Sequence, residues 1–240
     1  PDVRSYLDII TLGTIADLVP LRGANRVLTR RGLLELGRSN RPGIQALKAI
    51  ASVAPGPMTA GQVGFQLGPR INAAGRVDAA QKVVEMLTTD RYETAYAIAQ
   101  ELDDNNRARQ AMEARVLEQA LAQIEAEKLN EEERYSIVVG DEGWHPGVLG
   151  IVASRIVERF YRPTVVIGFD RGNGKGSARS VRGFHLGNAL QECANVLEKF
   201  GGHEYAGGLS IAAANFPLFR ARFEEMARAR LGSSASNAPA

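Results

Sequence analysis

The stretch from residue 91 to residue 127 contains neither proline nor glycine, and this absence of helix breakers constrains the fold most. Its second half carries one apolar stripe at helical spacing amid many charges, formed by Met112, Val116, Leu117, Ala120, Leu121 and Ile124. We therefore predict one long helix over residues 91–129, about 55 Å long if it is unbroken. So long a helix with so narrow a stripe is typical of a connector between domains.

The sequence follows different patterns on the two sides of this helix. Within residues 2–87, apolar residues recur at helical spacing between short proline and glycine breaks, which predicts several short helices and no strand. After a polar break, β-rich runs at 135–139 and 164–169 flank a helical pattern at 148–160. These three segments predict a β-α-β unit. The fold class is therefore α/β, with a helical first part.

The rest of the second part is predicted from the same signals. A glycine-rich basic stretch follows the β-α-β unit. We then expect a helix at 186–199, a glycine-rich turn, a strand at 209–212 and a last helix at 217–231. The small polar residues 233–240 predict a flexible tail. The domain boundaries are thus placed at 1–90, 91–129 and 130–232.

Overall composition excludes little beyond a membrane span. A net charge of +2 is too small to indicate nucleic-acid binding by itself, so the placement of the charges must decide. No segment approaches the roughly 18 to 20 apolar residues of a membrane helix, and no signal peptide is recognisable, which predicts a cytoplasmic protein.

Cys193 lies in an apolar pattern and is expected to be a buried, unreactive thiol. The chain begins without methionine, so we expect a fragment of a longer protein.

Two segments of the first part carry candidate chemistry. Asp17 stands in an otherwise apolar segment just before Pro20, where it could be a metal ligand or a cap at the end of a helix. The second segment contains Arg70, Asn72 and Arg76 among small residues. Arginine forks suit phosphate oxygens, although exposed arginines at the end of a helix are an equal alternative.

A third candidate lies where the first strand of the β-α-β unit enters its helix. Trp144 and His145 are flanked by glycines there. Such junctions bind ligands at the helix N-terminus, which would let the two rings contact bases or phosphate. The alternative is a tryptophan at the edge of the core and a histidine that caps the helix.

Residues 171–182 form the strongest electrostatic feature, with four cations, three glycines and no acid. The polar candidates in this stretch are Lys175, Ser177, Arg179 and Ser180. Its Gly-Lys-Gly-Ser lacks the spacing of a Walker loop, which argues against nucleoside triphosphate binding. The composition indicates an anion site, with a solvated basic hairpin as the alternative.

The last candidate is a glycine-rich turn that includes Gly201, Gly202 and His203. Its glycines would allow backbone amides to surround an anion, to which the imidazole donates a further hydrogen bond. Because an anion site needs converging donors, we expect residues 172–182 and 201–208 to face one another across one cleft.

These segments, taken in order, resemble the RecJ family of single-strand-specific exonucleases in the DHH phosphoesterase superfamily. Residues 12–21 look like the family's fourth motif, 68–76 like its fifth, and 143–155 resemble the sixth with its Gly-Trp-His-x-Gly-Val core. Residues 176–180 and 201–208 resemble the phosphate-binding and Gly-Gly-His elements of the DHH-associated domain. The resemblance implies the C-terminal part of a DHH domain, a linker helix and a DHH-associated domain.

The resemblance also implies roles for individual residues. Asp17 would bind a metal, Ser177 and Arg179 would hold a terminal 5′ phosphate, and His203 with its glycines would line the DNA path. The remaining candidates would contact DNA: Arg70, Asn72, Arg76 and His145. The implied reaction is 5′→3′ hydrolysis of single-stranded DNA with two Mn²⁺ or Mg²⁺ ions.

The Asp-x-Asp and Asp-His-His motifs that supply most of the family's metal ligands do not occur in this sequence. We expect them upstream of Pro1, and therefore expect this chain to be inactive alone while still binding a DNA 5′ end. The implied protein is a monomer, with a single-strand-binding protein or a helicase as partner. The alternatives are a smaller phosphodiesterase for short oligonucleotides or cyclic dinucleotides, and a non-catalytic DNA-binding protein.

Overall fold

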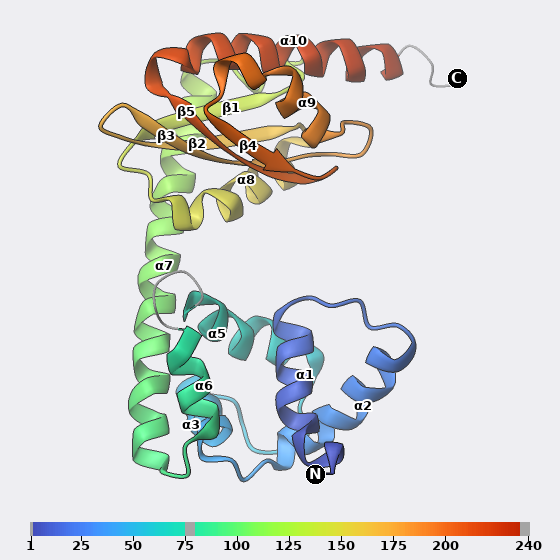
Figure 1. The fold of residues 1–240 in the computed structure, drawn as a ribbon, viewed down its shortest axis with the longest axis vertical. Coiled ribbons are helices and arrows are strands. Elements are labelled where there is room, and N and C mark those ends of the chain that lie inside the picture. Colours follow the sequence, from blue (N-terminus) through green and yellow to red (C-terminus); the bar gives the residue numbers. More distant parts are fainter. Residues whose placement is uncertain (1, 75–79, 236–240) are drawn as a thin grey trace. The chain divides into compact units, whose positions relative to one another are not determined.

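The computed structural model describes residues 2–74 and 80–235, and it divides into two compact units that meet within one helix. The units are Pro1–Gln110 and Ala111–Ala240. The shared helix is α7 (Tyr92–Ala126), which confirms the long helix expected near 91–129 (Figure 1). Each unit has its own core and is described by itself.

The described residues of the first unit form only helices and the loops between them, as predicted. Before α7 its elements are η1 (Val3–Tyr6), α1 (Leu7–Ala16), α2 (Gly23–Arg38), α3 (Pro42–Ile50), α4 (Ala60–Gln62), η2 (Val63–Leu67), α5 (Gly68–Ala74) and α6 (Ala80–Thr88). The consecutive α4, η2 and α5 form one rod in which η2 is a π-helical turn. Thr59 begins this rod with a capping box, in which its side chain and that of Gln62 satisfy each other's backbone amides.

The first half of α7 belongs to the core of the first unit. Ala95, Ile98, Ala99 and Leu102 are buried there at the i, i+3, i+4, i+7 spacing of one helix face. Helix α7 therefore runs from one unit into the other and also contributes to a core, and the prediction of a connector overlooked this second stripe. The predicted stripe of the other half is buried or half-buried except for Met112, which is exposed.

A buried ion pair holds α5 against the first half of α7. Asp103 of α7 is 1% exposed, and its carboxylate lies 2.8 Å from Nε of Arg70 on α5 and 2.7 Å from Nη2 of Arg107. A buried carboxylate requires such partners, because removal from water otherwise disfavours the charge.

The second unit is built on a five-stranded sheet of order β1-β2-β3-β5-β4. Its elements after α7 are β1 (Ile137–Glu142), α8 (Pro146–Phe160), β2 (Thr164–Asp170), β3 (Asn173–Arg179), α9 (Leu186–Glu192), η3 (Ala194–Val196), β4 (Lys199–Gly202), β5 (Ala206–Ala212), η4 (Ala213–Asn215) and α10 (Phe216–Ala235). Strands β1 and β2 are parallel and joined by α8, which confirms the predicted β-α-β unit. The other pairings are antiparallel.

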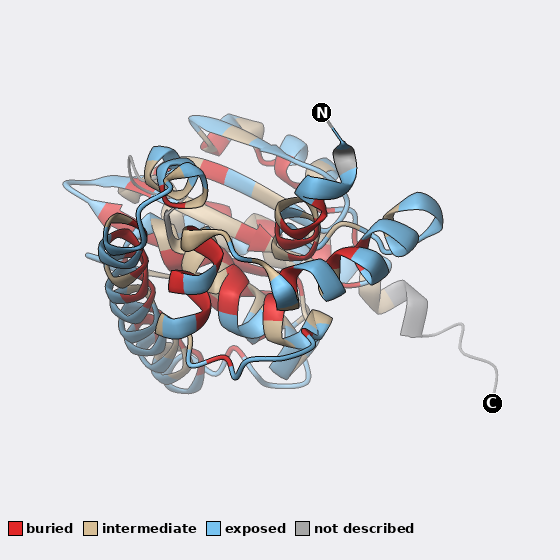
Figure 2. Ribbon diagram, turned by 90° about the horizontal axis from the view of Figure 1, so that it is seen from below, coloured by how far each residue is buried: buried red, intermediate tan, exposed pale blue. Residues whose placement is uncertain are grey.

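Helices cover the sheet on both faces (Figure 1). One face packs with α9 and α10 in a core that includes Phe184, Phe219 and Phe223. The opposite face packs with α8 and the second half of α7 in a separate core that includes Trp144. Figure 2 shows the buried residues on the inner sides of the elements and the exposed residues on the outer sides.

Two predicted boundaries in the second unit were wrong, and the basic stretch, for which no element was predicted, lies in a β-hairpin. The basic stretch 171–182 is largely strand β3, because it pairs with both β2 and β5. The helix expected at 186–199 ends at Glu192, and Lys199 opens β4 because it pairs with Ser210 of β5. Helix α10 continues to Ala235, so part of the predicted tail is helical, and residues 236–240 lie outside the described residues.

A glutamate of α10 fastens the start of β1. Its Glu224 carboxylate accepts hydrogen bonds from the backbone amides of Tyr135 (3.1 Å) and Ser136 (2.9 Å) and from the Ser136 hydroxyl (2.7 Å). These charge-assisted bonds satisfy backbone donors just before the strand begins, which sets where β1 starts against α10.

Among the described residues, no helix is both long enough and apolar enough to cross a membrane.

We predict that Asp103→Asn lowers the free energy of unfolding of the first unit by roughly 2–4 kcal/mol, because it leaves Arg70 without its buried counter-charge. Asp104→Asn is the matched control, since Asp104 is the exposed neighbour on the same helix, and it should cost less than about 0.5 kcal/mol. Urea denaturation followed by circular dichroism measures both. Equal losses for the two variants would contradict a stabilising role for the pair.

We also predict that Cys193 is protected from thiol reagents. The side chain is buried, and burial raises the pKa of its thiol to about 11. At pH 8 the thiolate fraction is then about a hundredfold lower than for a thiol of ordinary pKa. Reaction with Ellman's reagent should be at least that much slower in the folded chain than in urea. Equal rates in both conditions would contradict the buried placement.

Candidate nucleic-acid interface

The period of strand β3 places three polar side chains on the α8 face of the sheet: Lys175, Ser177 and Arg179. The residues between them point to the opposite face and are small. A Cβ added at Gly176 would lie 3.0 Å from the side chains of Ile167 and Leu209 on the neighbouring strands. The strand therefore packs tightly through its small residues and presents its polar residues on the other side.

Helix α8 passes close to two of these polar side chains because it has a glycine at the crossing. A Cβ added at Gly150 would lie 3.0 Å from an Nη atom of Arg179 and 3.5 Å from Oγ of Ser177. Arg179 also donates from Nη1 to the carbonyl of Ala178 at 2.9 Å. Both side chains are half-buried. The structure thus brings a hydroxyl and a guanidinium together, which is a donor set suited to phosphate oxygens.

Next to Ser177, the neighbouring positions on the same face of the sheet are two glycines. Ser177 pairs with Gly208 of β5, which pairs in turn with Gly201 of β4. Both glycines are exposed, and a Cβ added at Gly201 would meet no atom within 4 Å. We call Gly201 and Gly208 the glycine floor. Because it carries no side chains, a ligand can approach the backbone closely there.

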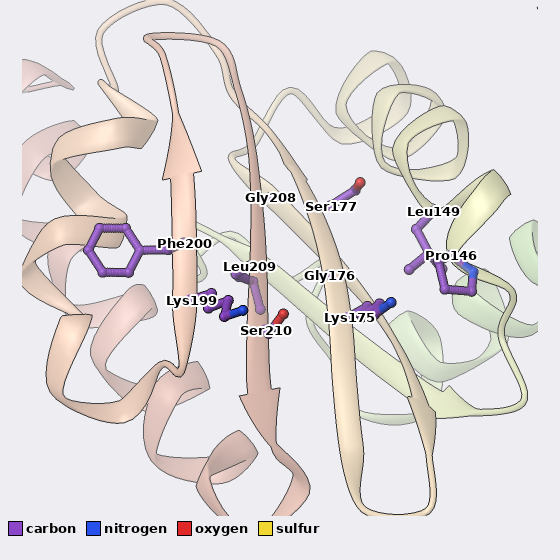
Figure 3. Close-up of a pocket in the computed structure, with 10 residues that line it drawn as sticks. All are labelled: Pro146, Leu149, Lys175, Gly176, Ser177, Lys199, Phe200, Gly208, Leu209 and Ser210. Carbon is purple, nitrogen blue, oxygen red and sulfur yellow. The ribbon is translucent and has the colours of Figure 1, made fainter. Parts of the chain in front are cut away.

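A shallow pocket of about 350 Å³ opens beside this floor (Figure 3). Its lining residues come from the first turn of α8 and from β3, β4 and β5: Pro146, Leu149, Lys175, Gly176, Ser177, Lys199, Phe200, Gly208, Leu209 and Ser210. The lining includes two lysines and no carboxylate. In Figure 3 the ring of Phe200 points away from the other labelled side chains. The pocket is therefore basic and suited to an anion.

The predicted glycine-rich turn is a β-hairpin rather than a loop around an anion. Gly201 and Gly202 lie in β4, and the amide of His203 donates to the carbonyl of Ala206 at 2.9 Å. That amide is therefore used within the hairpin. The expectation that 172–182 and 201–208 face one another across a cleft was wrong, because β3 and β4 flank β5 in a single sheet.

The polar side chains at the turn of this hairpin and beside it differ in whether they already have hydrogen-bond partners. His203 is exposed. Ser180, which directly follows β3, donates its amide to the carbonyl of Tyr205 at 3.0 Å and its hydroxyl to the carbonyl of Phe184 at 2.7 Å. Ser180 is thus committed to the local fold. A hydrogen bond with Glu204 raises the pKa of the Tyr205 hydroxyl.

At the start of α8, Trp144 is a core residue and His145 caps the helix, which are the two alternatives to a ligand site given above. Trp144 is 4% exposed within the core, and its Nε1 donates to Oε1 of Gln119 at 2.8 Å. His145 is the exposed cap of the helix, and its Nδ1 accepts from the amide of Gly147 at 3.0 Å. The tryptophan is therefore a core residue, whereas the Nε2 edge of His145 is not used by this cap.

The candidates of the first unit fall into two groups. The Asn72 side chain donates to the carbonyl of Ala16 at 2.9 Å, so α5 places Asn72 next to Asp17 at the end of α1. Asp17 is exposed and is the C-cap residue of α1, which agrees with the second of the two interpretations that the sequence left open. Arg70 points instead to Asp103. Arg76 lies outside the described residues.

The residues around Asp17 do not by themselves form a metal site. Within residues 2–74 and 80–235, no three His, Cys, Asp or Glu side chains come together as a possible set of ligands. Divalent Mg²⁺ and Mn²⁺ require several oxygen or nitrogen ligands. Asp17 can therefore contribute one ligand at most to such a site.

Sequence reasoning missed Lys199 and Ser210, which line the pocket together with Lys175. Lys199 was assigned to the end of a helix, and Ser210 to a strand without a role. The signal that could have found them is the period of two in Lys199-x-Gly201 and in Gly208-x-Ser210, which places each lysine or serine on the face of its glycine.

Comparison with known proteins shows which proteins this chain resembles. A family model described as the DHHA1 domain matches residues 133–229. The single-stranded-DNA-specific exonuclease RecJ of Bacillus subtilis is 43% identical over 92% of this chain and 28% of its own length. The protein of the same name from Escherichia coli is 39% identical over 94% of this chain and 40% of its own length.

A solved structure gives the same result. RecJ from Thermus thermophilus, in complex with Mg²⁺, superposes with a TM-score of 0.84 at 37% identity, covering 95% of this chain and 35% of the other. The chain thus spans 28% to 40% of the length of these curated relatives. Residues 133–229 thus match the DHHA1 domain, and nearly the whole of this chain is homologous to a part of the RecJ exonucleases that amounts to 28% to 40% of their length.

Proposed function

We propose that this chain is part of an exonuclease that removes nucleotides from the 5′ end of single-stranded DNA during recombination and repair in the cytoplasm, and that its second unit binds the terminal 5′ phosphate. The observation that carries the proposal is the convergence of Ser177 and Arg179 beside Gly150. The names of the relatives support this function over a smaller phosphodiesterase or a non-catalytic binding protein.

The donor set explains how a strand end would be selected. A terminal phosphate carries up to two negative charges, whereas an internal phosphodiester carries one. The Ser177 hydroxyl and the Arg179 guanidinium would donate to its oxygens, and both bonds strengthen with the charge on the acceptor. The glycine floor beside Ser177 would let the sugar-phosphate backbone lie flat on the strands. In this proposal His145, Lys175, Ser180, Gly201, Gly202 and His203 contribute further contacts or shape to the DNA path.

The first unit would contribute to hydrolysis. We propose that residues 1–90 are the C-terminal part of a DHH phosphoesterase domain, 91–129 its connecting helix and 130–232 the DNA-binding domain. Asp17 would supply one ligand to Mn²⁺ or Mg²⁺, the ions that occur in the Thermus thermophilus complexes. A bound metal pair would activate water and stabilise the leaving oxygen. Asn72, beside Asp17, and Arg76 would act near the strand, whereas Arg70 would hold α5 in place through its ion pair with Asp103.

We predict that Arg179→Ala reduces the preference for 5′-phosphorylated over 5′-hydroxyl oligothymidylate by about ten- to hundredfold, because a charge-assisted hydrogen bond contributes roughly 1.5–3 kcal/mol. Arg159→Ala, an exposed arginine near the end of α8, is the control and should leave the preference unchanged. Fluorescence anisotropy with both strands measures it. If Arg179→Ala weakens both strands equally, Arg179 is a general backbone contact.

We further predict that the purified 240-residue chain hydrolyses no single-stranded DNA in the presence of Mn²⁺, since Asp17 alone cannot hold a metal pair. It should still bind single strands weakly, because Lys175, Ser177 and Arg179 are all present. The logarithm of its affinity should fall with the logarithm of salt concentration, with a slope of roughly −0.7 per phosphate contact. Nuclease activity that EDTA abolishes, or binding that salt does not affect, would contradict this proposal.

A further inference from the structure

The pocket beside the glycine floor contains a row of three side chains from three strands. Lys175 of β3 pairs with Ser210 of β5, and Ser210 pairs with Lys199 of β4. Paired residues in antiparallel strands point to the same face, so the two ammonium groups lie on either side of one hydroxyl. All three residues line the same pocket (Figure 3). We call them the lysine row.

The lysine row lies next to the proposed phosphate site along the sheet. The neighbouring row contains Ser177 and the glycine floor. Two residues along a strand separate the rows, about 6.6–6.8 Å. This spacing is close to that of neighbouring phosphates in an extended single strand. A strand that ends at Ser177 and runs along β3 would therefore bring an internal phosphate over the lysine row.

The charges of the row are available to a ligand. The ion-paired lysines among the described residues are Lys82 and Lys128, not Lys175 or Lys199. Both lysines of the row are exposed, whereas Ser210 between them is half-buried. With no carboxylate in the lining, an anion in the pocket would meet two ammonium groups and one hydroxyl.

From this juxtaposition we propose that Lys175, Ser210 and Lys199 form a second phosphate subsite, which binds an internal phosphodiester of the same single strand. The inference rests on the proposed function for the position of the strand's end. It adds Lys199 and Ser210 as binding residues. It also gives the bound DNA a direction along β3, from its 5′ end at Ser177 towards Lys175.

A set of oligonucleotides with one neutral linkage each tests the subsite. The probe is 5′-phosphorylated octathymidylate with a 3′ fluorophore and a single methylphosphonate at each successive linkage, titrated into the full 240-residue chain at low salt. The wild-type chain should lose about tenfold in affinity when one particular linkage near the 5′ end is neutral. The Lys199→Ala variant should bind the unmodified strand about tenfold more weakly than the wild type does. Making that one linkage neutral should not weaken its binding further.

The matched control is Lys128→Ala, an exposed lysine of the second unit that is paired with Glu131. It should bind every strand as the wild type does. Lys199→Gln, which keeps most of the side chain, should reproduce Lys199→Ala if charge is the cause, and thermal melting checks that both variants fold. The subsite is refuted if Lys199→Ala has no effect, or if its effect adds to that of every neutral linkage alike.

The same titrations separate this inference from the proposed function. A 5′-hydroxyl version of the unmodified strand and the Arg179→Ala variant report on the terminal phosphate. If discrimination of the 5′ phosphate is absent while Lys199 still couples to one linkage, the proposed function fails and the subsite stands. If the 5′ phosphate is discriminated and no linkage couples to Lys199, the subsite fails and the proposed function stands.

Discussion

The two-residue period of strand β3 is the constraint on which the candidate site depends. One set of its residues must be small, because a Cβ added at Gly174 would lie 2.7 Å from the Phe169 side chain and 2.9 Å from that of Ile167. The alternate set must then face α8, where Gly150 leaves space for Ser177 and Arg179. A slip of one residue in the pairing would exchange the two faces and bury the arginine in the core with α9 and α10. Tight packing on one face thus fixes the side chains that we propose as phosphate ligands on the other.

Arginines in this chain serve different purposes, and their partners distinguish them. Arg70 forms an ion pair with the buried Asp103, and Arg155 forms one with Glu113, which is also buried. Both arginines belong to motifs that resemble those of DNA-processing relatives, yet in this structure each compensates a buried acid. Such pairs specify how the elements of one unit pack. A basic side chain in a motif that resembles one of a DNA-processing family is therefore not evidence of a phosphate contact until its partners are known.

Much of the architecture was predictable because it rests on local patterns. The absence of breakers over 91–127 predicted α7, and the buried runs of β1 and β2 around the amphipathic α8 predicted the β-α-β unit. The boundaries that failed depended on distant partners. Lys199 entered β4 because Ser210 was available to pair with it, and nothing within residues 186–199 indicates that strand. Backbone pairing between remote segments overrides local helical propensity in such cases.

The sequence by itself determined the chemistry that is present: the basic, acid-free stretch 171–182, the glycines around His203 and the ordered motifs that resemble RecJ. Only the tertiary structure decided which of these residues act together. It placed β5 between β3 and β4, so that Ser177 and the glycine floor share one row and Lys175 and Lys199 share the next. It also turned Trp144 into the core and exposed Asp17. The physical reason is that residue types and periods are local properties, whereas the register between strands is set by packing across the whole sheet.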